Sequence, residues 1–397
     1  MKIEDIKHVA VIGAGAMGHS IAEVTLMSGY TVSMHDIKEE FIERGKSQIE
    51  WSLQKLASKA RISESNPEKF MANLTTTVDL KKAVEKADLV IEAAPEDLEL
   101  KKKIFTDLDK FAPKHAILAS NTSNMSITEI GNATNRPDKV CGMHYFNPPV
   151  LMQLIEIVKG DKTSDETIKL MVEFTTKCTK TAIISKDSPS FIVNRLLGST
   201  ILWFQLMLDR KEYPPEKIDA AFMNMGIYMG PYETADFIGL DVIYHSMKYL
   251  AERLSKEHTP TPTLEKLIKE NKLGKKTGEG IYKWTEGSRP EIDTSDPADF
   301  DVMDQYKLMI NEAAKLLEEG VGTAKDIDTG VKLGLGSPWG PFELSEDIDL
   351  AELTIFLDGL ADKYDKEIFR AHKWIRDGTL MDHVKDVAAA EETRKSE

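Results

Sequence analysis

Short apolar runs alternate with amphipathic stretches along the first part of the chain. Residues 8–12 form a short continuous apolar run, which is typical of a buried parallel strand. Residues 19–28 carry apolar side chains at helical spacing and end at Gly29, a common helix stop, and residues 30–35 predict a second strand. A strand, a helix and a strand in this order predict a βαβ unit.

The same alternation continues beyond this unit. Residues 41–60 predict an amphipathic helix, and residues 61–69, which contain Asn66 and Pro67, predict the turn of an inserted helical hairpin. Further strand-like runs, with helical stretches between most of them, lie at residues 89–92, 116–119, 140–143 and 154–158. The pattern predicts an α/β fold with a doubly wound, mostly parallel sheet of the Rossmann type.

Helical patterns dominate from residue 190 onward, and the first of them spans residues 191–209. We therefore predict a domain boundary near Pro189 and an all-α second part of the chain. Two short motifs of this part return later in the same order and at nearly the same spacing: Ile218-Asp219 and Gly230-Pro231-Tyr232-Glu233 return as Ile327-Asp328 and Gly340-Pro341-Phe342-Glu343. Such a repeat indicates duplication of a helical unit.

The repeat divides the chain into three expected domains. Residues 1–188 are predicted to form the Rossmann-type domain, residues 189–287 the first copy of the helical domain, and residues 300–387 the second copy. Residues 287–299, which are rich in Pro, Asp and Ser, are the expected linker between the copies.

The charge of the chain narrows the class of partner. Among its 397 residues, 51 Lys and Arg stand against 66 Asp and Glu, which gives a net charge of −15. Nucleic acids and anionic membranes both require a positive surface, and no apolar run approaches the roughly 18 residues of a membrane span. We therefore expect no nucleic-acid and no membrane partner, and a phosphate-bearing ligand must find a local basic patch.

The two cysteines, Cys141 and Cys178, form neither a disulfide framework nor a zinc motif. We expect both to be core thiols in a reducing compartment, and we expect no bound metal. The first residues carry Glu4 and Asp5 where an export signal has basic residues followed by an apolar stretch. These features predict a cytoplasmic protein.

A dinucleotide-binding motif follows the first predicted strand. Gly13 permits a tight turn, Gly15 lets a pyrophosphate approach the backbone, and Gly18 lets the following helix pack closely. Asp36 ends the second strand, and its spacing from Gly18 is close to the value of about 20 for an acid that binds the adenosine ribose. A carboxylate there repels a 2′-phosphate, which favours NAD over NADP. The glycines alone do not distinguish a nicotinamide from a flavin carrier, or from a turn without ligand.

A histidine and a glutamate lie on successive predicted strands. Glu156 interrupts an apolar strand, where an ionised carboxylate is costly unless it has a partner. His144 lies at the end of the preceding strand, close enough in sequence for adjacent strands to bring the two together. A carboxylate on one imidazole nitrogen leaves the other as a general base, which suits oxidation of an alcohol with hydride transfer to a nicotinamide. A core histidine and a surface glutamate are the alternative interpretation of these residues.

Several motifs together resemble the (S)-3-hydroxyacyl-CoA dehydrogenases. The resemblance runs from the N-terminus to about position 285 and rests on these segments: Gly13 to Gly18, Glu96 with Lys101, Ser120 to Ser123, His144 to Pro148, Glu156, Phe191 to Arg195 and Gly278 to Tyr282. It implies His144 as the base, Glu156 as its orienting partner, and Ser123, Asn147 and Asn194 as polar groups around the substrate and nicotinamide. The cofactor contacts that it implies are Gly13, Gly15, Ala16, Met17, Gly18, Asp36, Glu96 and Lys101.

The inserted hairpin helps to hold coenzyme A in this family, and Ser52 and Lys59 match its ligand positions. Ser123 and Asn194 are further substrate-binding positions by the same match. The residues themselves are compatible, because Lys55, Lys59 and Arg61 form a basic patch in an acidic chain. A solvated helix face is the alternative.

The helical part departs from the shorter dehydrogenases, which have one copy of the helical domain and pair it with a partner subunit. The second copy here lacks a counterpart of residues 191–195, so we expect it to be structural and to take the place of a partner's domain. A homodimer or a monomer is then expected.

The expected activity is NAD-dependent, reversible oxidation of a short (S)-3-hydroxyacyl-CoA, such as 3-hydroxybutyryl-CoA, to the 3-oxoacyl-CoA. The alternatives are a dehydrogenase of a free 3-hydroxy acid, such as a sugar acid, and an NAD-binding protein without turnover. Dehydrogenases with a lysine base share the glycine motif, but they leave the His144 and Glu156 pair without a purpose.

Overall fold

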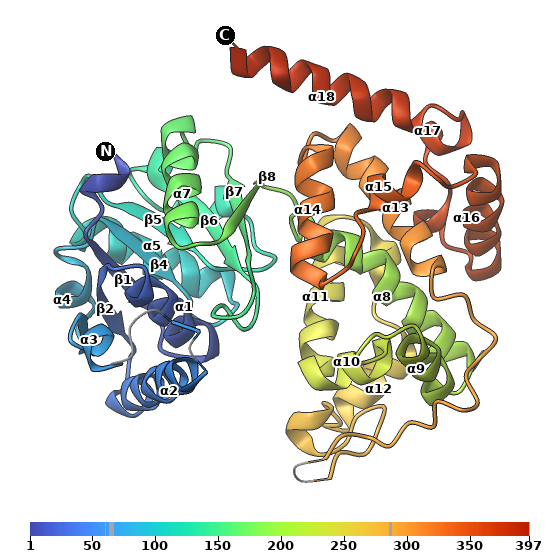
Figure 1. The fold of residues 1–397 in the computed structure, drawn as a ribbon, viewed down its shortest axis with the longest axis horizontal. Coiled ribbons are helices and arrows are strands. Elements are labelled where there is room, and N and C mark those ends of the chain that lie inside the picture. Colours follow the sequence, from blue (N-terminus) through green and yellow to red (C-terminus); the bar gives the residue numbers. More distant parts are fainter. Residues whose placement is uncertain (60, 63–66, 286–287, 397) are drawn as a thin grey trace. The chain divides into compact units, whose positions relative to one another are not determined.

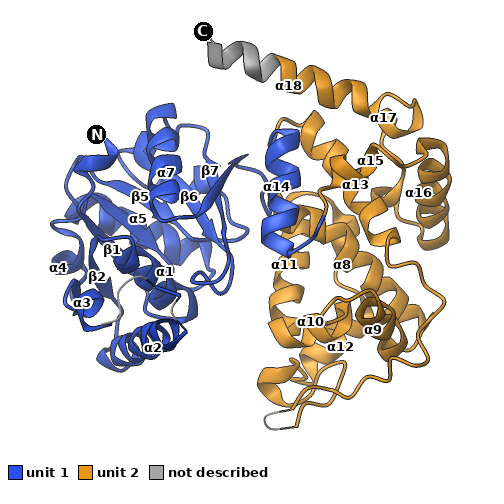
Figure 2. Ribbon diagram, viewed as in Figure 1, with its two compact units in different colours: residues 1–191, 321–338 blue, residues 192–320, 339–397 orange. Residues whose placement is uncertain are grey.

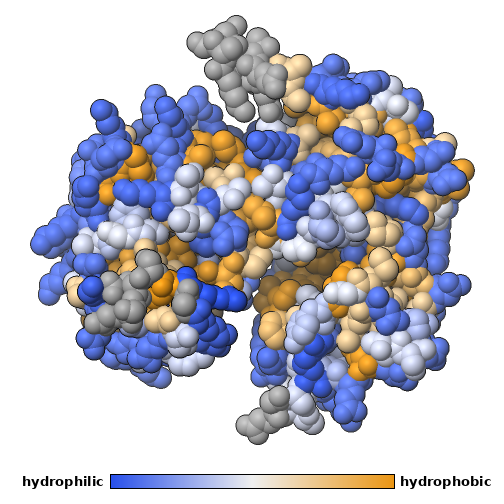
Figure 3. Space-filling view, viewed as in Figure 1, coloured by the Kyte–Doolittle hydropathy of each residue, from blue (hydrophilic) through white to orange (hydrophobic). Residues whose placement is uncertain are grey.

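The computed structural model describes residues 1–59, 61–62, 67–285 and 288–396, with side chains up to residue 389. The chain forms two compact units (Figure 2). Unit 1 comprises residues 1–191 and 321–338, and unit 2 comprises residues 192–320 and 339–397. The face drawn in Figure 3 is covered mostly by hydrophilic residues in both units, consistent with 29% charged residues in the chain.

Unit 1 is built on one eight-stranded sheet in the order β3-β2-β1-β4-β5-β6-β7-β8. Neighbouring strands are parallel except for the antiparallel pair β6 and β7, which confirms the predicted doubly wound, mostly parallel sheet. The strands are β1 (His8–Ile12), β2 (Thr31–His35), β3 (Leu74–Thr77), β4 (Leu89–Glu92), β5 (Ile117–Ser120), β6 (Val140–Tyr145), β7 (Leu154–Lys159) and β8 (Thr181–Lys186).

Helices cover both faces of this sheet (Figure 1). Because successive strand residues face opposite sides, Val9 and Val11 join one apolar core while Ala10 and Ile12 join the other. The first core also contains residues of α1 (Ala16–Met27), α2 (Glu39–Ser58) and α7 (Asp165–Lys177). The second contains residues of α4 (Leu80–Val84), α5 (Leu98–Phe111) and α6 (Ile127–Gly131). Short helical turns lie at η1 (Ile3–Asp5), α3 (Glu68–Met71) and η2 (Pro137–Lys139).

A helix from the second copy belongs to unit 1 by its contacts. Helix α14 (Ala324–Leu335) packs on β7 and β8. The Lys186 amide, at the end of the edge strand β8, donates to the Val321 carbonyl oxygen at 2.7 Å. The contacts therefore group residues 321–338 with the sheet, whereas the sequence repeat suggested domains that follow one another along the chain. The reason is that an edge strand leaves backbone groups for another segment to satisfy.

The helical part of the chain, from α8 onward, repeats its elements, and all of them except α14 belong to unit 2. The first set is α8 (Val193–Arg210), α9 (Pro215–Asn224), α10 (Pro231–Ile238), α11 (Leu240–Arg253), η3 (Lys256–His258), α12 (Pro262–Lys269) and η4 (Lys275–Thr277). The second is α13 (Asp304–Glu318), α14, α15 (Pro341–Ser345), α16 (Leu350–Tyr364), η5 (Glu367–Phe369) and α17 (Lys373–Arg376), followed by α18 (Leu380–Ser396). Corresponding α-helices begin at nearly the same spacing as the repeated sequence motifs, as duplication of a helical unit predicts.

Other sequence predictions have mixed outcomes. Cys141 and Cys178 are free and buried, which confirms them as core thiols. Strands β3 and β8 were not predicted, because they are edge strands with many polar or exposed positions. Residues Asn66 and Gly287, from the expected hairpin turn and linker, lie outside the described residues. No described helix is both long and apolar enough to cross a membrane.

Candidate active site

The carboxyl ends of the parallel strands gather the candidate residues at one edge of the sheet. The glycine turn follows β1, Asp36 follows β2, Glu96 follows β4, and Ser123 follows β5. The strand order reverses between β1 and β4, and ligands of doubly wound sheets bind outside the strand ends at this point. The fold therefore predicts a ligand site over the glycine turn.

The three glycines of the turn differ in what a side chain would meet at their positions. Gly13 has a φ of +108°, and a Cβ atom there would lie 2.5 Å from the Ala93 carbonyl oxygen. A Cβ atom at Gly18 would lie 1.9 Å from the carbonyl oxygen of Gly13, so this position in the first turn of helix α1 must be glycine. At Gly15 a Cβ atom would meet nothing within 4 Å, which leaves open space beside the N-terminus of α1. A pyrophosphate fits such a position, with backbone N–H groups and the helix dipole facing it.

Asp36 is tied to the glycine turn. Its Oδ2 accepts a hydrogen bond from the Ala14 amide at 2.8 Å, and its Oδ1 accepts one from the Ile37 amide at 2.7 Å. The side chain stays partly exposed. The carboxylate is therefore held at the mouth of the turn, where the ribose of a dinucleotide would meet it.

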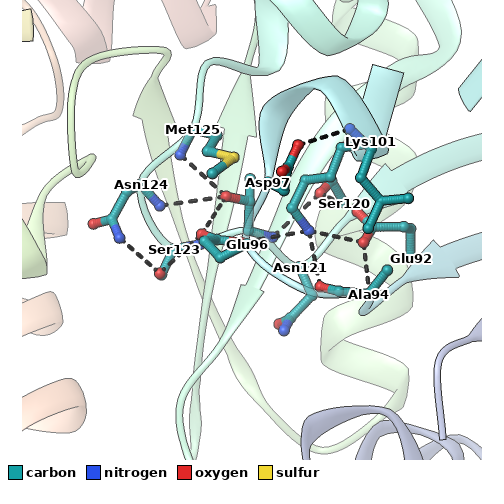
Figure 4. A network of polar contacts seen from close by, with 12 residues as sticks. Glu92, Ala94, Glu96, Asp97, Lys101, Ser120, Asn121, Ser123, Asn124 and Met125 are labelled. Atoms are coloured by element: carbon teal, nitrogen blue, oxygen red, sulfur yellow. Dashed lines mark hydrogen bonds and ion pairs between the residues drawn. The ribbon is translucent and has the colours of Figure 1, made fainter. Parts of the chain in front are cut away.

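A buried acid organises the loops after β4 and β5 (Figure 4). Glu92 is 0% exposed and accepts hydrogen bonds from the Ala94 amide at 2.7 Å, the Lys101 ammonium at 2.8 Å and the Ser120 hydroxyl at 2.6 Å. Lys101 also donates to the Ala94 carbonyl oxygen at 3.2 Å. A buried carboxylate and a buried ammonium each cost free energy unless they are paired, so these contacts fix both loops.

Glu96 lies on the exposed side of the same network. Its Oε1 accepts from the Thr122 hydroxyl at 2.6 Å and from the Ser123 amide at 2.8 Å and hydroxyl at 3.1 Å, and its Oε2 lies 3.3 Å from the Lys101 ammonium. Burial alone would raise the pKa of Glu96, but Lys101 and these hydrogen bonds outweigh it and lower the pKa. Lys101 was expected as a cofactor contact. Its side chain is 1% exposed, and its ammonium contacts both Glu92 and Glu96, so it holds Glu96 in place.

His144 and Glu156 face each other across the antiparallel pair β6 and β7. The reversed direction of β7 brings Glu156, near the start of that strand, beside the end of β6. The His144 Nδ1 atom lies 2.6 Å from Glu156 Oε2, and the two residues are 6% and 0% exposed. An ionised carboxylate can only accept, so Nδ1 is the donor of this hydrogen bond when Glu156 is ionised, and in a neutral imidazole the lone pair then lies on Nε2. Such an arrangement can present an oriented imidazole nitrogen on a nearly buried side chain.

Contacts link the Ser123 loop to this histidine. Asn124 donates to the Ser123 hydroxyl at 3.1 Å and accepts from the Ser190 hydroxyl at 3.1 Å. Phe191 follows Ser190, and its ring centroid lies 6.1 Å from that of His144. Ser123 and His144 therefore belong to one continuous set of contacts in unit 1.

The remaining candidates lie elsewhere. Asn147 is exposed in the loop that follows β6. Asn194 is the second residue of α8 and belongs to unit 2. Ser52 and Lys59 lie on α2 and at its C-terminal cap, partly and fully exposed, and Lys55 stacks over the Trp51 ring at 4.4 Å.

Sequence reasoning missed Glu92 and Thr122. Glu92 ends the apolar run of β4, so the argument that singled out Glu156, a carboxylate on an apolar strand, applies to it equally. Thr122 gave no such signal, because its partner Glu96 lies 26 residues away in the sequence. Among the described residues, no group of three or more His, Cys, Asp or Glu side chains could hold a metal ion.

A glycine turn at the switch point of a doubly wound sheet, with an acid at its mouth, defines a dinucleotide-binding domain of the kind found in dehydrogenases. Residues 8–188 match the family model of the 3-hydroxyacyl-CoA dehydrogenase NAD-binding domain. Residues 191–284 and 306–388 match the model of the C-terminal domain of the same dehydrogenases. The chain belongs to the 3-hydroxyacyl-CoA dehydrogenase family and is an oxidoreductase with NAD as its cofactor.

Individual relatives agree with this assignment. The mitochondrial hydroxyacyl-coenzyme A dehydrogenase of Homo sapiens is 40% identical over 291 residues, which cover 70% of this chain and 91% of that protein. A probable 3-hydroxybutyryl-CoA dehydrogenase of Deinococcus radiodurans is 40% identical over 276 residues, or 69% of this chain and 99% of that protein. The crystal structure of 3-hydroxybutyryl-CoA dehydrogenase from Escherichia coli K12 has a TM-score of 0.85 at 27% identity and covers 95% of this chain and 99% of that chain.

Proposed function

We propose that the protein oxidises short-chain (S)-3-hydroxyacyl-CoA thioesters, such as 3-hydroxybutyryl-CoA, reversibly to 3-oxoacyl-CoA, with His144 as the general base. The observation that supports this most is the 2.6 Å hydrogen bond between His144 and the fully buried Glu156. A short acyl chain is supported by the relatives, two of which carry 3-hydroxybutyryl-CoA in their names.

In this proposal the Nε2 atom of His144 takes the proton of the substrate hydroxyl. The imidazolium that forms is stabilised by the Glu156 carboxylate, which already accepts the Nδ1 proton and holds the ring orientation. Because Glu156 is 0% exposed, little solvent screens its charge from the imidazolium. The pair thus favours the charged state that proton transfer creates.

The glycine turn and the loops after β2 and β4 are the proposed cofactor site. The open space at Gly15 and the N-terminus of α1 fit the pyrophosphate, and Asp36 fits the adenosine ribose. Gly13, Ala16, Met17 and Gly18 complete the turn, and Glu96 with Lys101 forms its far side. Bound NAD supplies a hydride acceptor for the hydrogen on the hydroxyl-bearing carbon.

The other polar candidates are proposed to hold the substrate. Ser123 and Asn147 lie on the loops after β5 and β6, beside the strand that carries His144. Asn194 comes three residues after Phe191, whose ring is near His144. The amide groups of Asn147 and Asn194 can donate to a hydroxyl or thioester oxygen, and the Ser123 oxygen can accept from a substrate hydroxyl.

Helix α2 is the proposed contact for the coenzyme A part of the substrate. Ser52, Lys55 and Lys59 are exposed or partly exposed on this helix, and the two ammonium groups supply local positive charge in a chain of net charge −15. Phosphates are held at such a patch even when the whole protein is acidic.

We further propose that the protein is cytoplasmic, because its two cysteines are free thiols. We also propose that it acts as a monomer or a homodimer.

Initial rates of NADH formation with the thioester and the free acid test this proposal. We expect (S)-3-hydroxybutyryl-CoA to be oxidised far more efficiently than 3-hydroxybutyrate, and Lys59→Ala to raise the KM for the thioester only. Equal rates with both compounds would favour a free-acid dehydrogenase. Binding of NADH without turnover on any acyl chain length would favour a non-catalytic protein. Rates over a series of longer thioesters define the chain-length preference.

A further inference from the structure

The second helical copy is in contact with the segment that carries Asn194. Arg195, the next residue, is 2% exposed, and its guanidinium contacts two acids of the second copy. Its Nε atom lies 2.9 Å from Glu312 Oε1, and its Nη2 atom lies 2.7 Å from Glu319 Oε1. All three residues belong to unit 2, so the contacts are internal to one compact body.

The position of Arg195 explains why it needs two acids. It is the third residue of α8, in the first turn, where the free N–H groups and the helix dipole disfavour a positive charge. Burial disfavours that charge as well. Glu312 is itself 3% exposed, and although burial opposes its ionisation, Lys315 and Arg195 hold its pKa down to about 2. The charges of the cluster therefore depend on one another.

The contact is not reciprocated between the two copies. At the spacing of the repeat, the positions of the second copy that correspond to Arg195 are Asp304, Gln305 and Tyr306, none of which is basic. The positions of the first copy that correspond to Glu312 hold no acid, and they are Ile201, Leu202 and Trp203. In this cluster the first copy supplies the cation and the second copy supplies the anions. The position of the first copy that corresponds to Glu319 does hold an acid, Asp209, but this carboxylate accepts hydrogen bonds from Thr263 instead.

The segment that precedes α8 is held by its burial in unit 1. Ser190 and Phe191 have φ angles of 64° and 55°, which are unfavourable for residues with a side chain. Both are 0% exposed, and Phe191 packs into the core of unit 1. Since consecutive Cα atoms lie about 3.8 Å apart, Asn194 stays within about 11 Å of Phe191. Asn194 thus sits between two anchors along the chain, Phe191 before it and Arg195 after it.

We propose that Glu312 and Glu319 are positioning residues, through which the second helical copy holds Arg195 and thereby the Asn194 side chain in its working orientation. The inference rests on the proposed function of Asn194 in the dehydrogenase reaction. It gives the second copy a share in turnover, where the sequence suggested a structural part only. Neither acid contacts the substrate, and both act through the start of α8.

The variants Glu312→Gln and Glu319→Gln test the proposal in the full-length enzyme. We expect kcat with 3-hydroxybutyryl-CoA to fall by about 10- to 100-fold, as for a misplaced catalytic group, while the KM for NAD+ is unchanged. Hydrogen exchange of the backbone amides in residues 190–200 should quicken in the same variants. Glu367→Gln is the matched control, because Glu367 pairs with Arg370 on the surface of the second copy.

The outcomes separate this inference from the proposed function. If Glu312→Gln does not fold, Glu319→Gln decides, because the Glu319 side chain is 46% exposed and tolerates an amide. Wild-type kcat and unchanged exchange in the folded variants overturn the proposal, as does an equal loss in Glu367→Gln. Absence of thioester oxidation by the wild-type enzyme refutes the proposed function instead, and the exchange rates still report whether the acids anchor α8.

Discussion

A buried carboxyl on α1 makes the stability of unit 1 depend on pH. Glu23 is 0% exposed, and neither of its carboxyl oxygens has a hydrogen-bond partner of normal geometry in the part of the chain that the structure describes. Burial raises the pKa of Glu23 to about 7, and the nearby Ser52 hydroxyl on α2 offsets only part of this rise. The carboxyl therefore prefers to stay protonated in the folded protein.

The sign of the effect follows from proton binding. Between pH 4.5 and about 7 the folded protein keeps a proton that the unfolded chain has released. The free energy of unfolding therefore falls as the pH rises through this window, and the loss is complete above the folded pKa. For a rise of the pKa from 4.5 to about 7, the stability lost between pH 5 and pH 8 is roughly 2.5 kcal/mol.

Replacing Glu23 by Gln removes this titration. We expect the free energy of unfolding of Glu23→Gln, relative to that of the wild-type protein, to increase by roughly 2.5 kcal/mol when the pH rises from 5 to 8. Any effect of the amide that does not depend on pH cancels in this comparison. Urea unfolding at the two pH values measures the change. Glu43→Gln, an exposed position on α2, is the control and should show no comparable gain. If the free energies of unfolding of Glu23→Gln and the wild-type protein differed by the same amount at both pH values, the reasoning would be refuted.

Three further predictions concern the site. Glu156→Gln should lower kcat by about 100-fold with NAD affinity retained, because the imidazolium loses its stabilising charge; an unchanged kcat would contradict this. Gly18→Ala should abolish NAD binding in a titration with NADH, since its Cβ would lie 1.9 Å from the Gly13 carbonyl oxygen. Glu92→Gln should lower the free energy of unfolding by about 3 kcal/mol, because the buried Lys101 ammonium loses the negative charge of its partner. Urea unfolding measures this loss, and an unchanged midpoint of the unfolding transition would contradict the role of Glu92 as the partner of Lys101.

Local patterns in the sequence predicted the parts of the site that depend on local structure. The glycine turn and Asp36 lie within one βαβ unit, where strand ends and spacing define the geometry. His144 and Glu156 lie close together in the sequence, and the short connection between β6 and β7 makes them neighbours. Their contact could be predicted because the strands succeed each other, while their role in catalysis stays a prediction.

Other features depend on contacts that the sequence does not encode locally. The Glu312 and Arg195 pair joins residues 117 positions apart, and the Ser120 and Glu92 pair joins residues 28 positions apart. Helix α14 packs on β7 and β8, and the segment before it accepts a hydrogen bond from the end of β8, which a repeat pattern does not reveal. Lys101 matched a cofactor position by resemblance, and only the fold places its ammonium against Glu92.

The central claim is that His144 is the base of an NAD-dependent 3-hydroxyacyl-CoA oxidation. The most direct test is the rate of NADH formation from (S)-3-hydroxybutyryl-CoA by the wild-type enzyme and by His144→Gln at matched NAD occupancy. We expect rapid turnover by the wild type and a loss of at least about 100-fold in the variant, with NADH binding intact. Wild-type turnover by His144→Gln would contradict the claim.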